Sequence, residues 1–256
     1  MSFAASIVIP LLNQVDDWLE QSVRSALTQS VNTEVVVIRS KLTSPSNLEL
    51  LARLQQQYES LSVLLEDRSP HHFPAAINMG IRHATSDRVG LLLSDDWIER
   101  TTVAECLANS TDIVSTGAVV HYGNSNEVVC RTLSMSKFQA CETLELKASY
   151  LTHFFLFRKQ AVLAVGGLDE TIGNYPGIDD FDLIWTLLEH DATVSVLGKP
   201  MYHFREHEGE RLSRQDPKKN IQNLEKILRK HAVEKKEEIE IIKRHAHWYI
   251  KPVYEV

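Results

Sequence analysis

The chain has 256 residues, of which 43% are hydrophobic and 24% are charged, and its formal net charge is −7. This length and composition predict a globular protein with a substantial buried core, and they exclude a disordered chain. The charge is unevenly spread, at +3 from residue 216 onward and −10 before it. Because an acidic body lacks the basic face that phosphate binding requires, we expect no nucleic-acid partner.

No stretch approaches the run of about 20 apolar residues that a membrane-spanning helix needs. The short apolar run near the N-terminus, SIVIP, has no basic flank of the kind that precedes a secretory signal. We therefore expect a cytoplasmic protein.

Strand-like and helix-like patterns alternate over the first part of the chain. Short β-branched runs predict strands, and apolar residues at helical spacing, in two cases after a proline near the start, predict helices. Strands joined by helical crossovers imply a mostly parallel, Rossmann-like sheet with helices on both faces. The predicted strands cover 6–10, 34–38, 61–65 and 88–93, and the predicted helices cover 16–27, 44–58 and 73–84.

The carboxyl ends of these strands mark the expected ligand edge, because ligands of open parallel sheets bind just beyond them. The fourth strand ends in LLLSDDW, which places Asp95 and Asp96 directly after a run of leucines. Two carboxylates at a strand end can hold a hard divalent cation. A turn or a helix N-cap is the alternative role for the same pair.

From residue 112 onward the pattern changes. Residues 112–133 predict two or three strands with a Gly-Asn-Ser-Asn turn, as in an antiparallel hairpin. A further strand at 152–157 precedes a helix that ends in a glycine pair. The next helix, at 178–190, has acidic side chains in its first turn. Acidic residues complement the partial positive charge at a helix N-terminus, so helix capping is the alternative to a chemical role for them.

The last segment predicts an amphipathic helix whose apolar stripe packs on the body or on a second subunit, which would give a homodimer. Docking on an anionic membrane surface, at the inner face of the membrane, is the alternative, because Lys and Arg flank Trp248 and Tyr249. We accordingly divide the chain into a domain, 1–215, and a C-terminal helical extension, 216–256. The stripe consists of Ile221, Leu224, Ile227 and Leu228.

Six stretches in order resemble the family 2 glycosyltransferases of the GT-A fold. The resemblance implies an α/β fold in which a GT-A nucleotide-binding sheet is followed by an antiparallel acceptor-side portion. It implies transfer of a sugar from a nucleotide-sugar donor to a hydroxyl of a sugar or lipid-linked acceptor, with inversion and with Mn²⁺ or Mg²⁺ on the diphosphate, in polysaccharide biosynthesis. The stretches are SIVIPLLN, AAINMGIRHATSD, LLLSDDW, VGGLDE, IDDFDLIWTLLEHDA and YHFREHEGERLS.

The resemblance also implies roles for particular residues. Asp95 matches the second aspartate of the family's D-x-D motif and is the expected metal ligand, with His207 as a further one. Asp180 matches the Glu-Asp motif and is the expected general base, which inverting transfer needs because a sugar hydroxyl is a poor nucleophile until its proton is accepted. The expected contacts are Pro10, Leu11, Asn13, Arg39, Asn78, Asp95 and Asp96 for the nucleotide sugar, Trp97, Asp179 and Phe181 on the acceptor side, and Arg205 and Arg211 for the diphosphate.

The sequence departs from the family pattern mainly in the donor half. Leu93 stands where the family has its first D-x-D aspartate, and Arg39-Ser40-Lys41 stand where the second strand usually ends in Asp-Asp-Gly-Ser. Pro-His-His at 70–72 replaces Asn-x-Gly, and Thr186 replaces the usual arginine. Two hypotheses therefore stand: an active metal-dependent glycosyltransferase, and a non-catalytic GT-A-fold protein that serves in binding or assembly.

Overall fold

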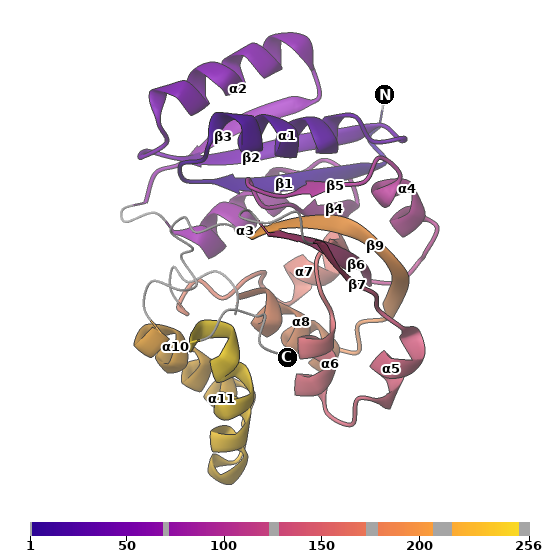
Figure 1. The fold of residues 1–256 in the computed structure, drawn as a ribbon, viewed down its shortest axis with the longest axis vertical. Helices are drawn as coiled ribbons and strands as arrows, with labels where there is room; N and C mark the ends of the chain where they lie inside the picture. Colours follow the sequence, from indigo (N-terminus) through magenta and orange to yellow (C-terminus); the bar gives the residue numbers. More distant parts are fainter. Residues whose placement is uncertain (1, 69–71, 123–127, 173–178, 207–216, 251–256) are drawn as a thin grey trace.

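The protein is described by a computed structural model. One continuous sheet forms its centre, and helices pack around it (Figure 1). The structure describes residues 2–68, 72–122, 128–172, 179–206 and 217–250. Its strands are β1 (Ala5–Leu11), β2 (Thr33–Ser40), β3 (Leu61–Glu66), β4 (Arg88–Leu91), β5 (Trp97–Ile98), β6 (Ile113–Tyr122), β7 (Val128–Arg131), β8 (Phe155–Arg158) and β9 (Val194–Glu206).

The sheet has a parallel half and a mixed half. Its strand order is β3-β2-β1-β4-β8-β6-β9-β5, and β7 pairs with β6. The first four strands of this order are mutually parallel. Beyond them β8 is antiparallel to both of its neighbours, and β6 and β9 run parallel to each other. This arrangement confirms the predicted α/β class with a mostly parallel sheet and an antiparallel portion.

Helices cover both faces of the sheet, as a buried parallel sheet requires. In β1 the side chains alternate between two apolar clusters: Ile7 and Ile9 pack with α1, α2 and α4, whereas Val8 packs with α3, α7 and α8. The helices are α1 (Asp16–Leu27), α2 (Pro45–Gln57), α3 (Phe73–His83), α4 (Thr102–Leu107), α5 (Met135–Ala140), α6 (Leu144–Tyr150), α7 (Lys159–Ala164), α8 (Asp179–Glu189), α10 (Pro217–Lys230) and α11 (Lys235–Ile250).

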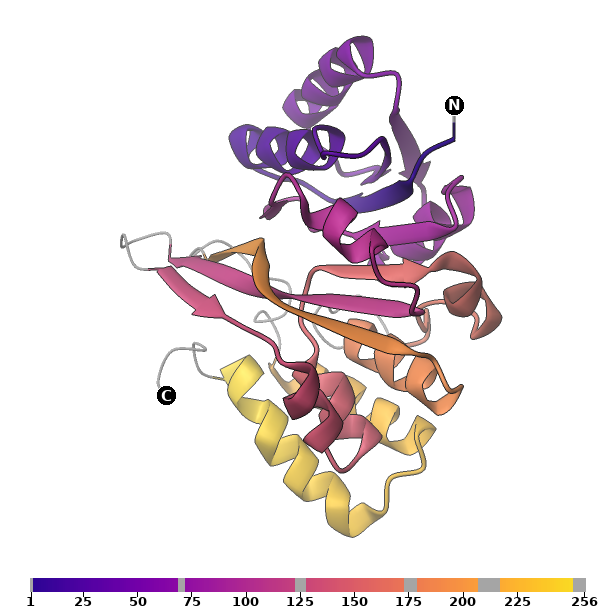
Figure 2. The same cartoon turned by 90° about the vertical axis from the view of Figure 1, so that its right-hand side faces the viewer.

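The outer parts of β6 and β9, together with β7, form a projecting arm of the sheet, which Figure 2 shows from the side. Only the first part of β6, Ile113–Ser115, pairs with β8, and β7 pairs with the outer part from Ala118 onward. The strand β9 follows β6 along its whole length. The sequence did not predict β9, and this strand carries several residues of the site described below.

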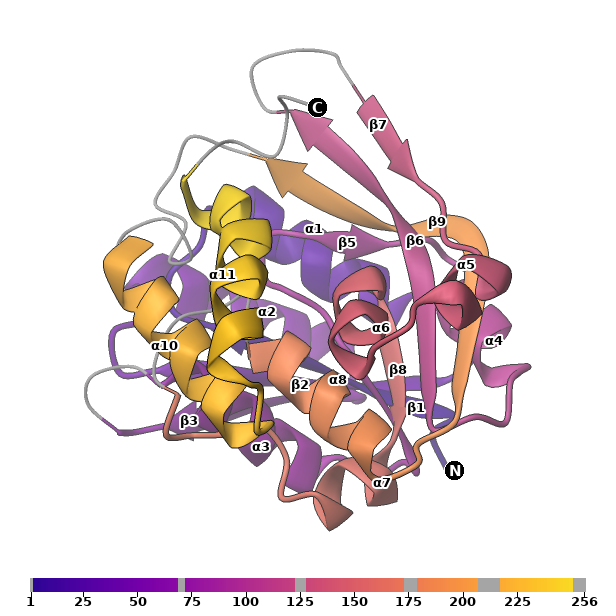
Figure 3. The same ribbon diagram turned by 90° about the horizontal axis from the view of Figure 1, so that it is seen from below.

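The C-terminal helices α10 and α11 lie side by side, and in Figure 3 they are seen next to α6 and α8. Leu224, Ile227 and Leu228 are fully buried in the same apolar cluster as Leu183 and Ile184 of α8. The apolar stripe therefore packs on the body, the first of its two predicted positions. Among the described helices, none combines the length and the apolar character needed to cross a bilayer.

Polar contacts also hold the tail in place. The carboxylate of Asp182 on α8 contacts Lys230 at 2.7 Å and His231 at 3.0 Å, and the His231 ring stacks on Trp185 at 4.2 Å. Asp182 is 1% exposed. The acidic first turn of α8 thus supplies a structural ion pair to α10 as well as the predicted base.

Replacing Asp182 with asparagine is expected to lower the free energy of unfolding by about 1 to 3 kcal/mol, because a buried charged acceptor of two hydrogen bonds is lost. Urea denaturation measures this change. The matched control is Glu240→Gln on α11, which removes an exposed pair with Lys243 and should leave the midpoint unchanged. Equal midpoints for Asp182→Asn and the wild type would contradict the structural role of Asp182.

Candidate active site

The turn after β4 presents Asp95 at the carboxyl edge of the sheet. The backbone stays beside β1 for one further residue, since the Leu92 N–H donates to the Val8 carbonyl at 3.1 Å. The chain then turns, with the Asp96 N–H bonded to the Leu93 carbonyl at 3.2 Å. Asp95 lies within this turn, two residues after Leu93, and is half-buried. Its position agrees with the rule that ligands bind beyond strand carboxyl ends.

Asp96 is the buried anchor of this turn. One carboxylate oxygen accepts a hydrogen bond from the Tyr202 hydroxyl at 2.5 Å, and the other accepts from the Arg205 N–H at 2.7 Å. Burial and the Asp96 carboxylate together raise the pKa of Tyr202 well above its usual value. Both carboxylate oxygens of Asp96 are thus directed to protein groups, and its expected contact with the donor stays a prediction.

Arg205 supports the same turn instead of pointing toward an open diphosphate position. Its Nε donates to the Asp95 carbonyl at 2.9 Å, and its Nη2 donates to Gln21 Oε1 at 2.6 Å. The guanidinium lies 4.8 Å from the ring centroids of both Trp18 and Trp97, a cation–π geometry. Burial lowers the pKa of Arg205, although the nearby carboxylates Asp96 and Asp95 oppose that shift.

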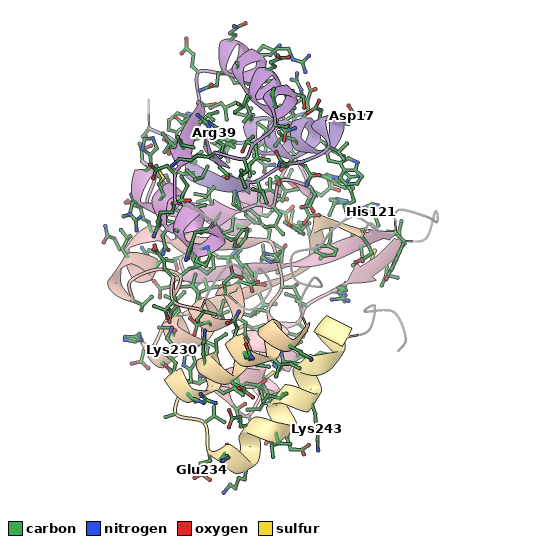
Figure 4. The ribbon with its side chains drawn as sticks, turned by 90° about the vertical axis from the view of Figure 1, so that its left-hand side faces the viewer. Asp17, Arg39, His121, Lys230, Glu234 and Lys243 are labelled. Atoms are coloured by element: carbon green, nitrogen blue, oxygen red, sulfur yellow. The ribbon has the colours of Figure 1, made fainter. Side chains whose placement is uncertain are left out.

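Trp97 belongs to a stack of rings along β5, β9 and β6. It stacks on His203 at 4.8 Å with an interplanar angle of 8°, and it contacts His121 at 4.7 Å. His121 Nε2 lies 2.8 Å from His203 Nδ1, and His203 Nε2 lies 2.7 Å from Glu99. Figure 4 shows His121 on the projecting arm. Burial, followed by the neighbouring charges of His203 and Arg205, lowers the pKa of His121.

Asp180, the expected base, lies in the first turn of α8 with 23% of its side chain exposed. His153 Nε2 lies 3.1 Å from Oδ2, and the Phe181 N–H donates to Oδ1 at 2.9 Å. Burial would raise the pKa of Asp180, but the hydrogen bond and charge of His153 and the backbone N–H groups outweigh it, so the pKa lies below its usual value.

Two residues that were not assigned roles from the sequence connect the two acidic motifs. The His153 ring packs 5.4 Å from the Tyr202 ring, and Tyr202 in turn donates to Asp96. The structure therefore brings Asp180 and the Asp95-Asp96 turn to one region through His153 and Tyr202.

The two expected acceptor-side residues on α8 point inward. Asp179 is 3% exposed and Phe181 is 7% exposed. The Phe181 ring packs against Trp185 at 5.5 Å and against His245 of α11 at 5.0 Å. Phe181 is thus a core contact between α8 and the tail, and its acceptor-side role stays a prediction.

Asn78 joins α3 to the loop ahead of α8. Its amide exchanges two hydrogen bonds of 2.8 Å with the backbone of Leu168 and donates to Glu170 at 3.0 Å. The approach requires Gly167, which has a φ of +80°, because a Cβ there would lie 2.3 Å from Asn78 Oδ1. Asn78 therefore has a buried structural position, and its donor contact stays a prediction.

The remaining predicted donor residues lie at the ends of β1 and β2. Pro10 and Leu11 are buried at the end of β1. Asn13 is exposed and accepts from the Ser44 N–H at 2.6 Å. Arg39 pairs in register with Leu11 and is half-buried (Figure 4). Two further predicted residues, His207 and Arg211, lie outside the described residues.

A divalent cation at this site would depend chiefly on Asp95. Within the part of the chain that the structure describes, no group of three His, Cys, Asp or Glu side chains is placed to hold a metal ion. Leu93 offers no side-chain ligand, and Asp96 is held by Tyr202 and Arg205. Magnesium commonly binds through one or two carboxylates plus substrate phosphates and water. Asp95 therefore fits a cation that arrives with a diphosphate.

Comparison with known proteins decides the family. The sequence profile described as Glycosyl transferase family 2 matches residues 6–166. The chain belongs to this family. A curated relative, O-antigen biosynthesis protein RfbC of Myxococcus xanthus, is 24% identical over 205 residues, which cover 78% of this chain and 16% of that protein. The matched region is thus a small part of the relative's length.

Solved structures of similar fold cover nearly the whole chain. S. aureus TarS 1–349 in complex with UDP-GlcNAc superposes with a TM-score of 0.68 at 16% identity, covering 95% of this chain and 72% of that one. The mannosyltransferase PcManGT from Pyrobaculum calidifontis, in complex with GDP-Man and Mn²⁺, gives 0.63 at 16% identity, covering 96% and 70%. Both similarities confirm the GT-A-type fold expected for a family 2 chain.

Proposed function

We propose that this family 2 chain transfers a sugar from a nucleotide-sugar donor to a hydroxyl of a sugar or lipid-linked acceptor, with inversion at the anomeric carbon. The observation that carries the proposal is Asp180, a partly exposed carboxylate held by His153 in the region of the Asp95-Asp96 turn. As the acceptor oxygen bonds to the anomeric carbon, the bond to the diphosphate breaks and Asp180 takes the hydroxyl proton.

The donor is proposed to lie along the carboxyl edge of β1, β2 and β4, next to Asn13, Arg39 and Asp95. The complexes of TarS with UDP-GlcNAc and of PcManGT with GDP-Man support a nucleotide sugar as the ligand class. Asp95 would hold Mn²⁺ or Mg²⁺, which neutralises the charge of the departing diphosphate. The name of the Myxococcus xanthus relative, an O-antigen biosynthesis protein, supports a saccharide acceptor in polysaccharide assembly.

A second candidate function is binding or assembly without catalysis. It is favoured by Leu93 at the metal position and by Arg39 at the end of β2, where the usual acidic residues are absent. In that case Asp180 would have only a structural role in the first turn of α8.

A thermal-shift panel tests the proposal. UDP-GlcNAc, GDP-mannose and other nucleotide sugars are each added with and without Mn²⁺, and free sugars serve as the control. A donor at 100 times its Kd should add about 2.7 kcal/mol to the stability of the folded state, and the reaction should release its nucleoside diphosphate. If no nucleotide sugar raises the melting temperature and none is turned over, the non-catalytic alternative gains and the proposal fails.

A further inference from the structure

His153 is held in a fixed orientation directly before β8. Its ring packs edge-on against Phe155 at 4.8 Å and against Tyr202 at 5.4 Å, and 26% of its side chain is exposed. These contacts limit rotation of the imidazole, so Nε2 stays directed at Asp180.

The hydrogen bond to Asp180 requires a proton on one particular nitrogen of the imidazole. An ionised carboxylate only accepts hydrogen bonds, so Nε2 of His153 must be the donor. The other nitrogen, Nδ1, is buried and has no hydrogen-bond partner among the described residues. A buried polar atom without a partner costs about 1 to 3 kcal/mol. An apolar residue with only a packing role at this position would avoid that cost. We therefore attribute the role of His153 to Nε2, the nitrogen that faces Asp180.

We propose that His153 is the positioning residue for Asp180, fixing the direction in which its carboxylate faces the acceptor for proton transfer. This inference rests on the proposed function, in which Asp180 is the general base. The Phe181 N–H and His153 each bind one oxygen. Each oxygen retains a lone pair, and the exposed part of the side chain leaves room for the acceptor hydroxyl.

The interaction has a pH consequence with a definite sign. Because His153 contributes to lowering the pKa of Asp180, the carboxylate stays ionised as the pH falls, until it passes that lowered value. Without His153, the Asp180 carboxylate would become protonated, and would stop acting as a base, at a higher pH than in the wild type. The other titratable neighbours are Asp179 on α8 and Tyr202 on β9. Tyr202 stays neutral in this range, because burial and Asp96 raise its pKa well above the usual value.

The direct test is a carbon-13 NMR titration of the Asp180 carboxyl in ligand-free protein, with its signal assigned by its absence in Asp180→Asn. The midpoint should move to higher pH in His153→Phe and to an intermediate position in His153→Gln, whose neutral amide restores a donor but not a charge. The matched control is His190→Gln, an exposed histidine at the end of α8, which should leave the midpoint unchanged. Identical midpoints in the wild type and in His153→Gln overturn the proposal, even if the phenylalanine variant does not fold.

A kinetic measurement separates this inference from the proposed function. With UDP-GlcNAc or GDP-mannose as the probe, His153→Phe should lower kcat by about 10- to 100-fold with the donor KM unchanged, and His153→Gln should recover part of the loss. If Asp180→Asn keeps the wild-type rate, the base assignment of the proposed function fails. If Asp180→Asn is inactive while both His153 variants match the wild type in rate and midpoint, only the inference about His153 fails.

Discussion

Replacing Asp180 with asparagine is expected to lower the rate of sugar transfer by about 10²- to 10⁴-fold, the usual cost of losing a general base. The amide is nearly the same size as the carboxylate and can still meet the Phe181 N–H, so the fold and the donor affinity should be preserved. Transfer to an acceptor, and slow donor hydrolysis without one, are the measurements.

Asp182→Asn is the matched control for this experiment. Asp182 lies two residues further along α8, which places it about 200° around the helix from Asp180, and it faces Lys230 and His231 of the tail. Its substitution should cost stability and leave most of the activity. Equal losses of activity in the two variants, at a temperature where both are folded, would remove the special role of Asp180.

Replacing Asp95 with asparagine is expected to abolish the metal-stimulated part of donor binding. Because no group of three His, Cys, Asp or Glu side chains among the described residues is placed to hold a metal ion, we expect Asp95 to carry most of the protein's share, and the donor affinity measured with Mn²⁺ should fall by about 100-fold, or about 2.7 kcal/mol. Without metal, the wild type and the variant should bind the donor equally. Calorimetric titration in the presence and absence of Mn²⁺ measures both quantities.

Two variants sharpen the test of Asp95. Asp17→Asn, on the exposed surface of α1 (Figure 4), removes a carboxylate of the same type and should change nothing. Leu93→Asp supplies the side-chain oxygen that the turn lacks and should strengthen binding with metal. The metal assignment is wrong if Asp95→Asn responds to Mn²⁺ in the same way as the wild type.

The sequence predicted the parallel half of the sheet well, because its two central strands, β1 and β2, are mostly apolar runs buried on both faces. It did not predict β9, whose pattern is broken by Gly198 and Pro200. The pairing of β6 with β9 shifts register near this break, around Gly117. Local pattern rules fail at such irregular strands, where long-range pairing and not local sequence determines the structure.

The sequence named candidate site residues but did not indicate how their side chains are oriented. Asp180 and Phe181 are neighbours in sequence, yet one is partly exposed beside His153 and the other is buried against His245, since consecutive residues of a helix point about 100° apart. Asp96 and Asn78 were expected to meet a donor, but their partners, Tyr202 and Leu168, are distant in sequence. His153 had no local signal, because its importance comes only from packing next to α8.

The tryptophan side chains are placed so that their intrinsic fluorescence can report on two parts of the molecule. Of the four tryptophans in the chain, Trp18 and Trp97 both contact the Arg205 guanidinium that holds the Asp95 backbone. Trp185 lies on the other side of the sheet, stacked on His231 of the tail. Indole emission responds to nearby charge, so the first two rings sense events at the Asp95 turn, while Trp185 senses the seating of the C-terminal helices. Intrinsic fluorescence therefore reports on both of these regions without any added label.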